Sequence, residues 1–202
     1  MRLERAFFER SPVTQIAREL IGMVLCTEIE GQLTKGRIVE TEAYAAVGDR
    51  ACHAHLGRFT RRTRTMYEAG GTAYIYLCYG IHHLFNVAVN QKGVPDAVLI
   101  RGVEPLHGVE TMLERRGMVK AERRLTAGPG VLSQAMGLTT AFNGHDLCTP
   151  GSQIRIEDDG VSAQLQDAIE TGPRVGIDYA GEDALLPWRY WLSGSKWKSP
   201  AK

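Results

Sequence analysis

Alternation of apolar and polar positions dominates the first half of the chain, and it predicts several short strands. The stretches 23–28 and 34–44 are rich in β-branched and apolar residues, with turn residues 30–32 between them. On a strand, residues two apart share a face. One face of the second strand therefore carries Ile38, Glu40, Glu42 and Tyr44.

The two glutamates on that face are unusual neighbours. Their Cα atoms are expected to be roughly 6.6 Å apart at the usual strand rise. Two carboxylates are costly to bury unless they are paired with cations or used in chemistry. On periodicity alone, a solvent-exposed edge strand is the simpler interpretation of Glu40 and Glu42.

A second alternating stretch predicts a β-hairpin. Residues 71–80 form a strand with three tyrosines, residues 80–83 form a turn, and residues 84–90 run back. The return strand has an apolar face, which we expect in the core. Its other face, expected to be polar or functional, carries Asn86, Ala88 and Asn90.

Helical spacing and end signals predict helices at residues 12–21, with Ser11 as the cap, and at residues 105–116 and 131–136. Further short strands are predicted at residues 97–103, 153–157, 173–177 and 189–192. We expect residues 46–71 to be irregular and the polar tail 196–202 to be frayed. This mixture indicates an α+β fold. It would be a single compact domain over residues 1–202, with a mixed, mostly antiparallel sheet, surrounding helices and a protruding β-hairpin.

Composition changes this picture at one loop only. The 202 residues are 44% hydrophobic and 23% charged and carry a net charge of +1, which is ordinary for a globular protein. The irregular segment, however, concentrates positive charge in Arg58, Arg61, Arg62 and Arg64. A local basic stripe of this kind can bind nucleic acid even when the net charge is small.

Targeting signals are absent from the sequence. The first residues are charged and lack the apolar region of a signal peptide, and no run approaches the roughly 20 apolar residues of a membrane span. The four cysteines are widely spread and form no CxxC. We therefore expect reduced thiols, a cytoplasmic location and no membrane partner.

Several familiar kinds of site do not fit. Cys52, His53 and His55 lie close together, but their spacing matches no zinc signature. The chain has no phosphate-binding loop, no dinucleotide fingerprint and no GxSxG. The turn 128–130 could present backbone N–H groups to a phosphate, although a plain entry into the following helix is the simpler interpretation.

The carboxylates remain as candidate chemistry. Glu42 with a nearby arginine could deprotonate a water molecule, and a carboxylate also stabilises the cationic transition state of cleavage at a sugar anomeric carbon. Tyrosines would stack on a flat leaving group, and the arginine loop would bind phosphates. Together these features point to hydrolysis of a base–sugar bond in a nucleic acid.

An ordered set of motifs over nearly the whole chain resembles the alkyladenine (3-methyladenine) DNA glycosylases found in vertebrates and bacteria. The matching residues are 37–44, His53, 71–80, Asn86, 99–106, Gly128, Pro129, Leu132 and 174–176.

The resemblance implies a role for each matching residue. Glu42 would activate the attacking water, with Arg101 and the backbone carbonyl of Val175 helping to hold that water. Tyr44, His53 and Tyr76 would sandwich a flipped base, since base flipping gives access to a stacked nucleotide. Tyr79 would push into the duplex, and Asn86 would clash with the amino group of normal guanine. The arginines of the loop, Arg58, Arg61, Arg62 and Arg64, would contact the DNA backbone.

The resemblance also implies the substrate and the partners. The enzyme would be a monofunctional DNA-3-methyladenine glycosylase of base excision repair that needs no metal or cofactor and leaves an abasic site. Its partner would be double-stranded DNA with a damaged purine: 3-methyladenine, a 7-methylpurine, hypoxanthine or ethenoadenine. It would act as a monomer in the bacterial cytoplasm, associated with the nucleoid when on DNA. One departure is the Ile-His-His at residues 81–83, where the family is expected to carry bulkier hydrophobic or aromatic residues.

Two other functions are compatible with the residues. A non-catalytic nucleic-acid binding module would use Glu42 only structurally, and a small-molecule nucleoside N-ribohydrolase would need no arginine loop. A helix-hairpin-helix glycosylase is excluded because no paired helices flank the turn 128–130. We also expect Glu40 to raise the proton affinity of Glu42 by like-charge repulsion.

Overall fold

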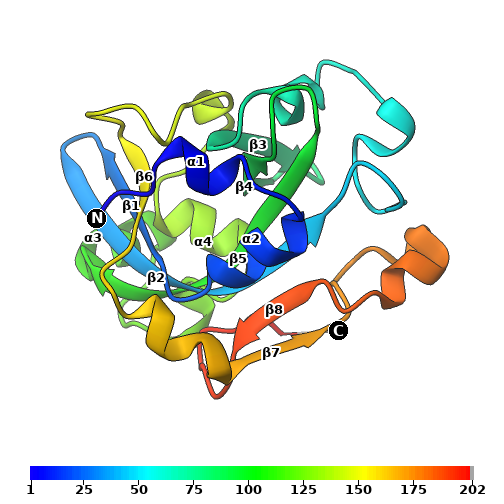
Figure 1. Ribbon diagram of the computed structural model, residues 1–202. Coiled ribbons are helices and arrows are strands. Elements are labelled where there is room, and N and C mark those ends of the chain that lie inside the picture. Colours follow the sequence, from blue (N-terminus) through cyan, green and yellow to red (C-terminus); the bar gives the residue numbers. More distant parts are fainter. Residues whose placement is uncertain (201–202) are drawn as a thin grey trace.

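The fold is built around one long strand, β2 (Gln32–Tyr44), inside an eight-stranded sheet (Figure 1). In the computed structural model, which describes residues 1–200, the order is β3 (Thr72–Cys78), β4 (His82–Val89), β5 (Asp96–His107), β2, β1 (Val24–Ile29) and β6 (Ile154–Glu157). The strands β7 (Ile169–Gly172) and β8 (Arg189–Leu192) form a ribbon, and β8 also pairs with β2. These pairings are antiparallel, which confirms the predicted α+β domain with a mostly antiparallel sheet.

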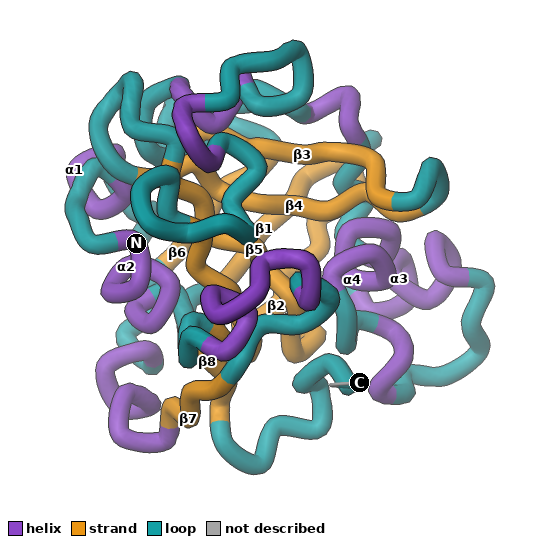
Figure 2. The backbone as a smooth tube through the Cα atoms, turned by 90° about the vertical axis from the view of Figure 1, so that its right-hand side faces the viewer, coloured by secondary structure: helices purple, strands orange, loops and turns teal. Residues whose placement is uncertain are grey.

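Helices cover the two sides of this sheet. The α-helices are α1 (Arg5–Phe8), α2 (Val13–Glu19), α3 (Val109–Arg116) and α4 (Pro129–Ala135). Figure 2 shows α2 on one side of the strands and α3 with α4 on the other. The short 3-10 helices are η1 (His55–Gly57), η2 (Arg64–Tyr67), η3 (Arg123–Leu125), η4 (Thr140–Phe142), η5 (Ser162–Ala168) and η6 (Asp178–Leu185). No helix among residues 1–200 is long and apolar enough to cross a membrane.

β2 has neighbouring strands on both edges, so the edge-strand interpretation of its glutamates is wrong. Glu40 lies opposite Gly102 of β5 and Trp191 of β8, and the side chains of Glu40 and Glu42 are fully buried. The register with β5 shifts on each side of Glu40. Such irregularities locally bend a strand and re-aim its side chains, and they are common beside active sites.

The predicted hairpin is confirmed as β3 and β4, and it extends from the sheet at its tip (Figure 2). Its turn lies at residues 79–81, not 80–83, and β4 begins at His82, two residues earlier than predicted. Tyr79 and Gly80 form the turn, with φ of 51° and 74°. Positive φ at both central positions of a turn matches the right-handed twist of the two strands. Glycine adopts positive φ without steric cost, which explains why Gly80 lies in this turn. Phe85 and Val87 of β4 enter the core, as predicted.

Two predicted elements are wrong because tertiary pairing overrides local sequence signals. Residues 105–107 continue β5 instead of opening a helix, and α3 begins only after Gly108, whose φ is 69°. Pro105 is tolerated in the strand because it lies opposite Gly36, where the register of β2 shifts. Residues 173–177 do not form a strand, and the strand in this region is β7.

Two further predictions are wrong, one about the start of the first predicted helix and one about the C-terminal tail. The helix α2 begins at Val13, with Pro12 as an extended N-cap residue and no side-chain cap, so Ser11 does not have the capping role predicted for it. The tail is not frayed over residues 196–200, because Trp197 and Ser199 are buried and Ser199 bonds to Glu40. Residues 201–202 lie outside the described part of the chain.

Candidate active site

A row of side chains crosses four strands of the sheet, from the edge strand β3 to β2. The pairings Tyr74–Asn86, Asn86–Leu99 and Leu99–Glu42 place these four residues side by side across β3, β4, β5 and β2. Because paired residues project to the same side and strands repeat every two residues, nearby positions of the same strands join this face. The alternation seen in the sequence thus brings side chains of distant segments together on one buried face of the sheet.

Glu42 receives hydrogen bonds on both carboxylate oxygens. The backbone N–H of Val175 donates to Oε1 at 2.7 Å, the hydroxyl of Tyr44 donates to Oε2 at 2.8 Å, and Nη1 of Arg101 donates to Oε2 at 3.2 Å. Burial, together with the negative charge of Glu42, raises the pKa of Tyr44 well above its usual value, so the phenol stays neutral and donates. The contact of Val175 with Glu42 is made by its N–H; the expected role of its carbonyl stays a prediction.

Glu40 belongs to a compact charged cluster with Arg101 and Arg189. Its Oε1 accepts bonds from Nε of Arg189 at 2.7 Å and Nε of Arg101 at 3.1 Å. Burial lowers the pKa of Arg101, but the charges of Glu42 and Glu40 outweigh this effect and the pKa is raised overall. Two guanidinium groups therefore balance the two buried carboxylates, which makes their burial tolerable.

A cavity of about 630 Å³ opens beside this cluster. This is within the range of about 300–1,000 Å³ that small-molecule and cofactor pockets occupy. Its lining includes six of the residues proposed from the sequence to touch the base or the water, the proposed intercalating residue and two of the loop arginines: Tyr44, His53, Tyr76, Asn86, Arg101 and Val175, then Tyr79, then Arg58 and Arg62. Glu42 lies directly behind Tyr44, Arg101 and Val175, which contact it.

His53 is held in one orientation and without a charge. Nη2 of Arg62 lies 3.3 Å from Nε2, and Nδ1 lies 2.9 Å from the hydroxyl of Tyr74. Because a guanidinium can only donate, Nε2 is the acceptor and Nδ1 carries the proton. Burial and the positive charges of Arg62 and Arg58 lower the pKa of His53 to about 4. The ring also meets Tyr76 edge to face, with centroids 4.8 Å apart.

A buried ion pair anchors the segment that carries Val175. Arg174 makes two bonds to Asp49, of 2.6 and 2.7 Å, and a third to the carbonyl of Ala43 at 2.8 Å. Its guanidinium also lies over the ring of Tyr44, 4.8 Å from the centroid. Bidentate arginine–carboxylate pairs fix geometry as well as charge. Arg174 thus fixes the Val175 N–H and the Tyr44 ring together.

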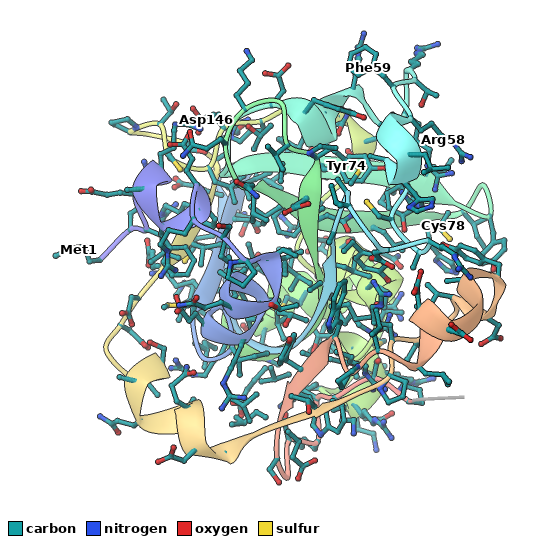
Figure 3. The ribbon with its side chains drawn as sticks, turned by 45° about the vertical axis from the view of Figure 1, so that its right-hand side comes forward. Met1, Arg58, Phe59, Tyr74, Cys78 and Asp146 are labelled. Atoms are coloured by element: carbon teal, nitrogen blue, oxygen red, sulfur yellow. The ribbon has the colours of Figure 1, made fainter. Side chains whose placement is uncertain are left out.

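The arginine loop divides into two parts. Arg58 and Arg62 border the cavity, and the guanidinium of Arg62 lies 4.5 Å from the centroid of Tyr76. Arg61 and Arg64 are exposed on the same loop but do not line the cavity. Figure 3 shows Arg58 and Cys78 on one side of the molecule, with Tyr74 further inside and Met1 on the opposite side.

The hairpin tip presents apolar side chains to solvent on the same side. Tyr79 is 91% exposed and Ile81 is 70% exposed. The two histidines after Ile81 contact other parts of the protein. His83 accepts a hydrogen bond from the N–H of Thr140. The ring of His82 packs on Gly130 so closely that a Cβ added to Gly130 would lie 3.0 Å from it. The turn 128–130 therefore supports the hairpin.

Sequence reasoning missed three contributors to this site. Arg174 was part of a recognised motif, but nothing in its spacing indicated its pairing with Asp49. Arg189 and Ser199 come from segments interpreted as an ordinary strand and a frayed tail, and both contact Glu40. Among residues 1–200 no three His, Cys, Asp or Glu side chains are close enough to hold a metal ion.

The arrangement combines a buried carboxylate, a fixed cation and an aromatic cavity beside exposed arginines. A carboxylate of this kind can take a proton from water, and the rings can hold a planar heterocycle. The exposed arginines can bind phosphates. Hydrolysis of the bond between a base and a sugar uses all of these features.

Comparison with known proteins agrees with this chemistry. The sequence profile of the family described as methylpurine-DNA glycosylase (MPG) matches residues 6–196. A protein of Chlamydia abortus is 47% identical over 191 residues, which cover 94% of this chain and 97% of that protein. A protein of Desulfitobacterium hafniense is 42% identical over 205 residues, which cover 98% of each chain. Both carry the provisional name 3-methyladenine DNA glycosylase. The chain therefore belongs to the methylpurine-DNA glycosylase family.

Proposed function

We propose that this DNA glycosylase removes damaged purines from double-stranded DNA by direct attack of a water molecule activated by Glu42. The observation that carries the proposal is the environment of Glu42, a fully buried carboxylate held by Val175, Tyr44 and Arg101 at the edge of an aromatic cavity. A carboxylate offers about four acceptor sites, and three hydrogen bonds occupy this one. One site, on Oε1, is left for the attacking water.

The reaction balances without a cofactor. The oxygen of water bonds to C1′ of the deoxyribose as the glycosidic bond breaks. The electron pair of the glycosidic bond leaves with the base. The proton of the water passes to Glu42. The positive charge that develops on the sugar is stabilised by the nearby carboxylate. An abasic site and the free base are the products: a cationic alkylated purine leaves as a neutral base, whereas a neutral purine such as hypoxanthine must also take up a proton as it departs.

The cavity suits a planar base that carries a positive charge. Tyr44 and Tyr76 line the cavity, and each ring has a guanidinium over one face, so a purine with a quaternary nitrogen would stack on the other face. His53 is uncharged at neutral pH because its pKa is near 4, so it does not repel a cationic base. Alkylated purines such as 3-methyladenine and 7-methylpurines are therefore the first substrates to test, followed by hypoxanthine and ethenoadenine.

The damaged nucleotide must flip out of the base stack to reach this site, because the site is a cavity and a base stacked inside a duplex cannot enter it. The exposed ring of Tyr79 at the hairpin tip is suited to fill the gap in the duplex, and the loop arginines to hold the flanking phosphates. We expect a monomer to suffice, acting in the cytoplasm on chromosomal DNA.

Glu42→Gln tests the chemical step. The substitution keeps the size of the side chain but removes the base, so release from alkylated DNA is expected to fall by about 10²–10⁴-fold. Affinity for the damaged duplex is expected to change little. Freed bases are identified by mass spectrometry, and binding is measured on the same duplex by fluorescence anisotropy.

The outcomes separate the alternative functions. Unchanged base release in Glu42→Gln would remove the catalytic role of Glu42. Binding without any release by the unmodified protein would indicate a nucleic-acid binding module. Release from free nucleosides that does not depend on salt would favour a small-molecule N-ribohydrolase.

A further inference from the structure

The last described residues of the chain are built into the interior against Glu40 and Arg101, the latter a direct contact of the proposed catalytic carboxylate. Trp197 and Ser199 are 5% and 2% exposed. The guanidinium of Arg123 donates twice to the carbonyl of Lys198, at 2.8 and 3.0 Å, and the Lys198 ammonium lies 3.6 Å from the ring centroid of Trp191. These contacts hold the end of the chain against η3 and β8.

A glycine of β5 makes room for this segment. An added Cβ on Gly102 would lie 2.6 Å from the carbonyl oxygen of Trp197, so any side chain there would displace the segment. Glycine allows this close approach of two backbones, and Gly102 is also the partner of Glu40 across the sheet. The sheet is thus shaped to receive residues 197–199.

Ser199 completes the hydrogen bonding of Glu40. Its backbone N–H donates to Oε2 at 2.5 Å and its hydroxyl donates to Oε1 at 2.8 Å. The carbonyl of Ser199 accepts a bond from Nη2 of Arg189 at 3.3 Å. Each polar group of this residue therefore meets a buried charged partner.

Arg101 connects this arrangement with Glu42. Its three nitrogens contact three different partners: Nε contacts Glu40 at 3.1 Å, Nη2 contacts the Ser199 hydroxyl at 3.1 Å, and Nη1 contacts Glu42 at 3.2 Å. A guanidinium is rigid and planar, so fixing two of its nitrogens determines where the third lies. Without the hydroxyl, Nη2 would lose its partner and the plane could tilt about Nε.

We propose that Ser199 is a positioning residue that, with Glu40, sets the guanidinium of Arg101 against Glu42, so that the C-terminal segment completes the active site. The inference rests on the proposed function, in which Glu42 activates water. It assigns to the end of the chain a part in the chemical step in addition to any part in stability.

Ser199→Ala tests the proposal, with Ser193→Ala as the matched control. Ser193 lies in the same C-terminal region, and its hydroxyl bonds to the exposed Glu170. The measured quantities are the single-turnover rate of base release at saturating enzyme, the dissociation constant for damaged duplex and the melting temperature. We expect the rate of Ser199→Ala to fall about tenfold or more, because displacing a group by about 1 Å can cost ~10²-fold. The dissociation constant should stay within about twofold, and Ser193→Ala should match the unmodified protein.

A second variant keeps the volume of the side chain in case alanine unfolds the segment. Ser199→Cys replaces the hydroxyl by a weak donor of similar size and should also slow release at unchanged affinity. In an Arg101→Lys background, Ser199→Ala should cost much less than in the unmodified protein, since Ser199 acts through the guanidinium. Equal losses in both backgrounds would overturn the proposal.

The same assay separates this inference from the proposed function. If Glu42→Gln abolishes release while both Ser199 variants keep the unmodified rate, only the positioning role is overturned. If the Ser199 variants lose release only in proportion to their loss of folded protein, the role is structural and the proposal is also overturned. If Glu42→Gln keeps full release, the proposed function fails, and this inference fails with it.

Discussion

Asn86 lies in the wall of the cavity with its amide group already bonded to the backbone. Nδ2 donates to the carbonyls of Tyr74 at 3.1 Å and Leu84 at 3.2 Å, and the side chain is only 3% exposed. An amide held by two acceptors cannot turn aside to admit a larger base. The polar face predicted for β4 therefore gives a rigid wall, suited to exclude a base with an additional amino group.

Asn86→Ala is expected to raise release of unmodified guanine relative to release of hypoxanthine, by about tenfold or more, since one small group in a pocket discriminates by about 10–200-fold. The loss of two hydrogen bonds should also lower stability by about 1–3 kcal/mol. The ratio of the two released bases is the measurement, because it does not depend on the folded fraction. An unchanged ratio would contradict a role for Asn86 in specificity.

The two glutamates of β2 differ in their partners. The sequence suggests that Glu40 repels Glu42, but the carboxylate of Glu40 contacts Arg189, Arg101 and Ser199. Its charge is balanced by two cations, so the geometry does not support net repulsion. Glu40 is better understood as the group that holds Arg101, while Glu42, with one acceptor site left, faces the proposed reaction.

At the scale of elements, the β3–β4 hairpin places a large aromatic ring where it packs against nothing. Tyr79 has a left-handed conformation in the turn, with φ of 51°, which non-glycine residues seldom adopt. Leu77 and Ile81 beside it are also exposed. A strained, solvent-exposed aromatic tip serves no purpose in core packing and is suited to insertion between bases.

Tyr79→Ala should weaken binding to a damaged duplex by about 1–3 kcal/mol, or about 5- to 150-fold, which is the usual contribution of one stacked ring. Release of a base from single-stranded DNA should change much less, since no gap in a duplex needs filling. Val119→Ala is the control, because Val119 is 99% exposed and lies outside the cavity lining. Equal losses on both substrates would argue against insertion.

The sequence predicts elements well where local patterns determine them. The strands β2, β3 and β4, the turn with Gly80 and the helices α2 and α4 follow from alternation, helical spacing and glycine placement. The end of β5 does not, because Pro105 and Leu106 are typical of a helix start and only pairing with β2 keeps them extended. Residues 173–177 read as a strand because Val175 and Ile177 alternate, but the Val175 N–H is bonded to Glu42.

At the scale of the whole molecule, the proposed active site is assembled from parts that no local pattern connects. Glu42, Arg101, Val175 and Ser199 come from β2, β5, an irregular segment and the end of the chain. The sequence indicates that a buried Arg101 needs an anionic partner. Which carboxylate is that partner follows only from the pairing of β5 with β2. The resemblance to a family supplied Glu42, Arg101 and Val175, whereas Ser199 required the structure.

Charge is also distributed on the scale of the whole molecule. The net charge is +1, but Arg58, Arg61, Arg62 and Arg64 gather on the loop that borders the cavity. Figure 3 shows Arg58 of this loop on the side of the molecule opposite Met1. Each phosphate contact releases counterions, so the logarithm of the binding constant falls with the logarithm of salt concentration by about 0.9 per contact. Local positive charge, and not net charge, should therefore determine how binding depends on salt.

Arg58→Gln should reduce the magnitude of this salt slope by about 0.9, with a uniform loss of affinity for damaged and undamaged duplexes. Arg2→Gln removes the same charge near Met1, far from the cavity, and should leave the slope unchanged. Binding of both variants is measured at several salt concentrations, and Arg61→Gln and Arg64→Gln in the same series show whether the outer arginines also reach phosphates. An equal change for Arg58→Gln and Arg2→Gln would mean that net charge alone matters, and the arginine loop would lose its assigned role in binding the DNA backbone.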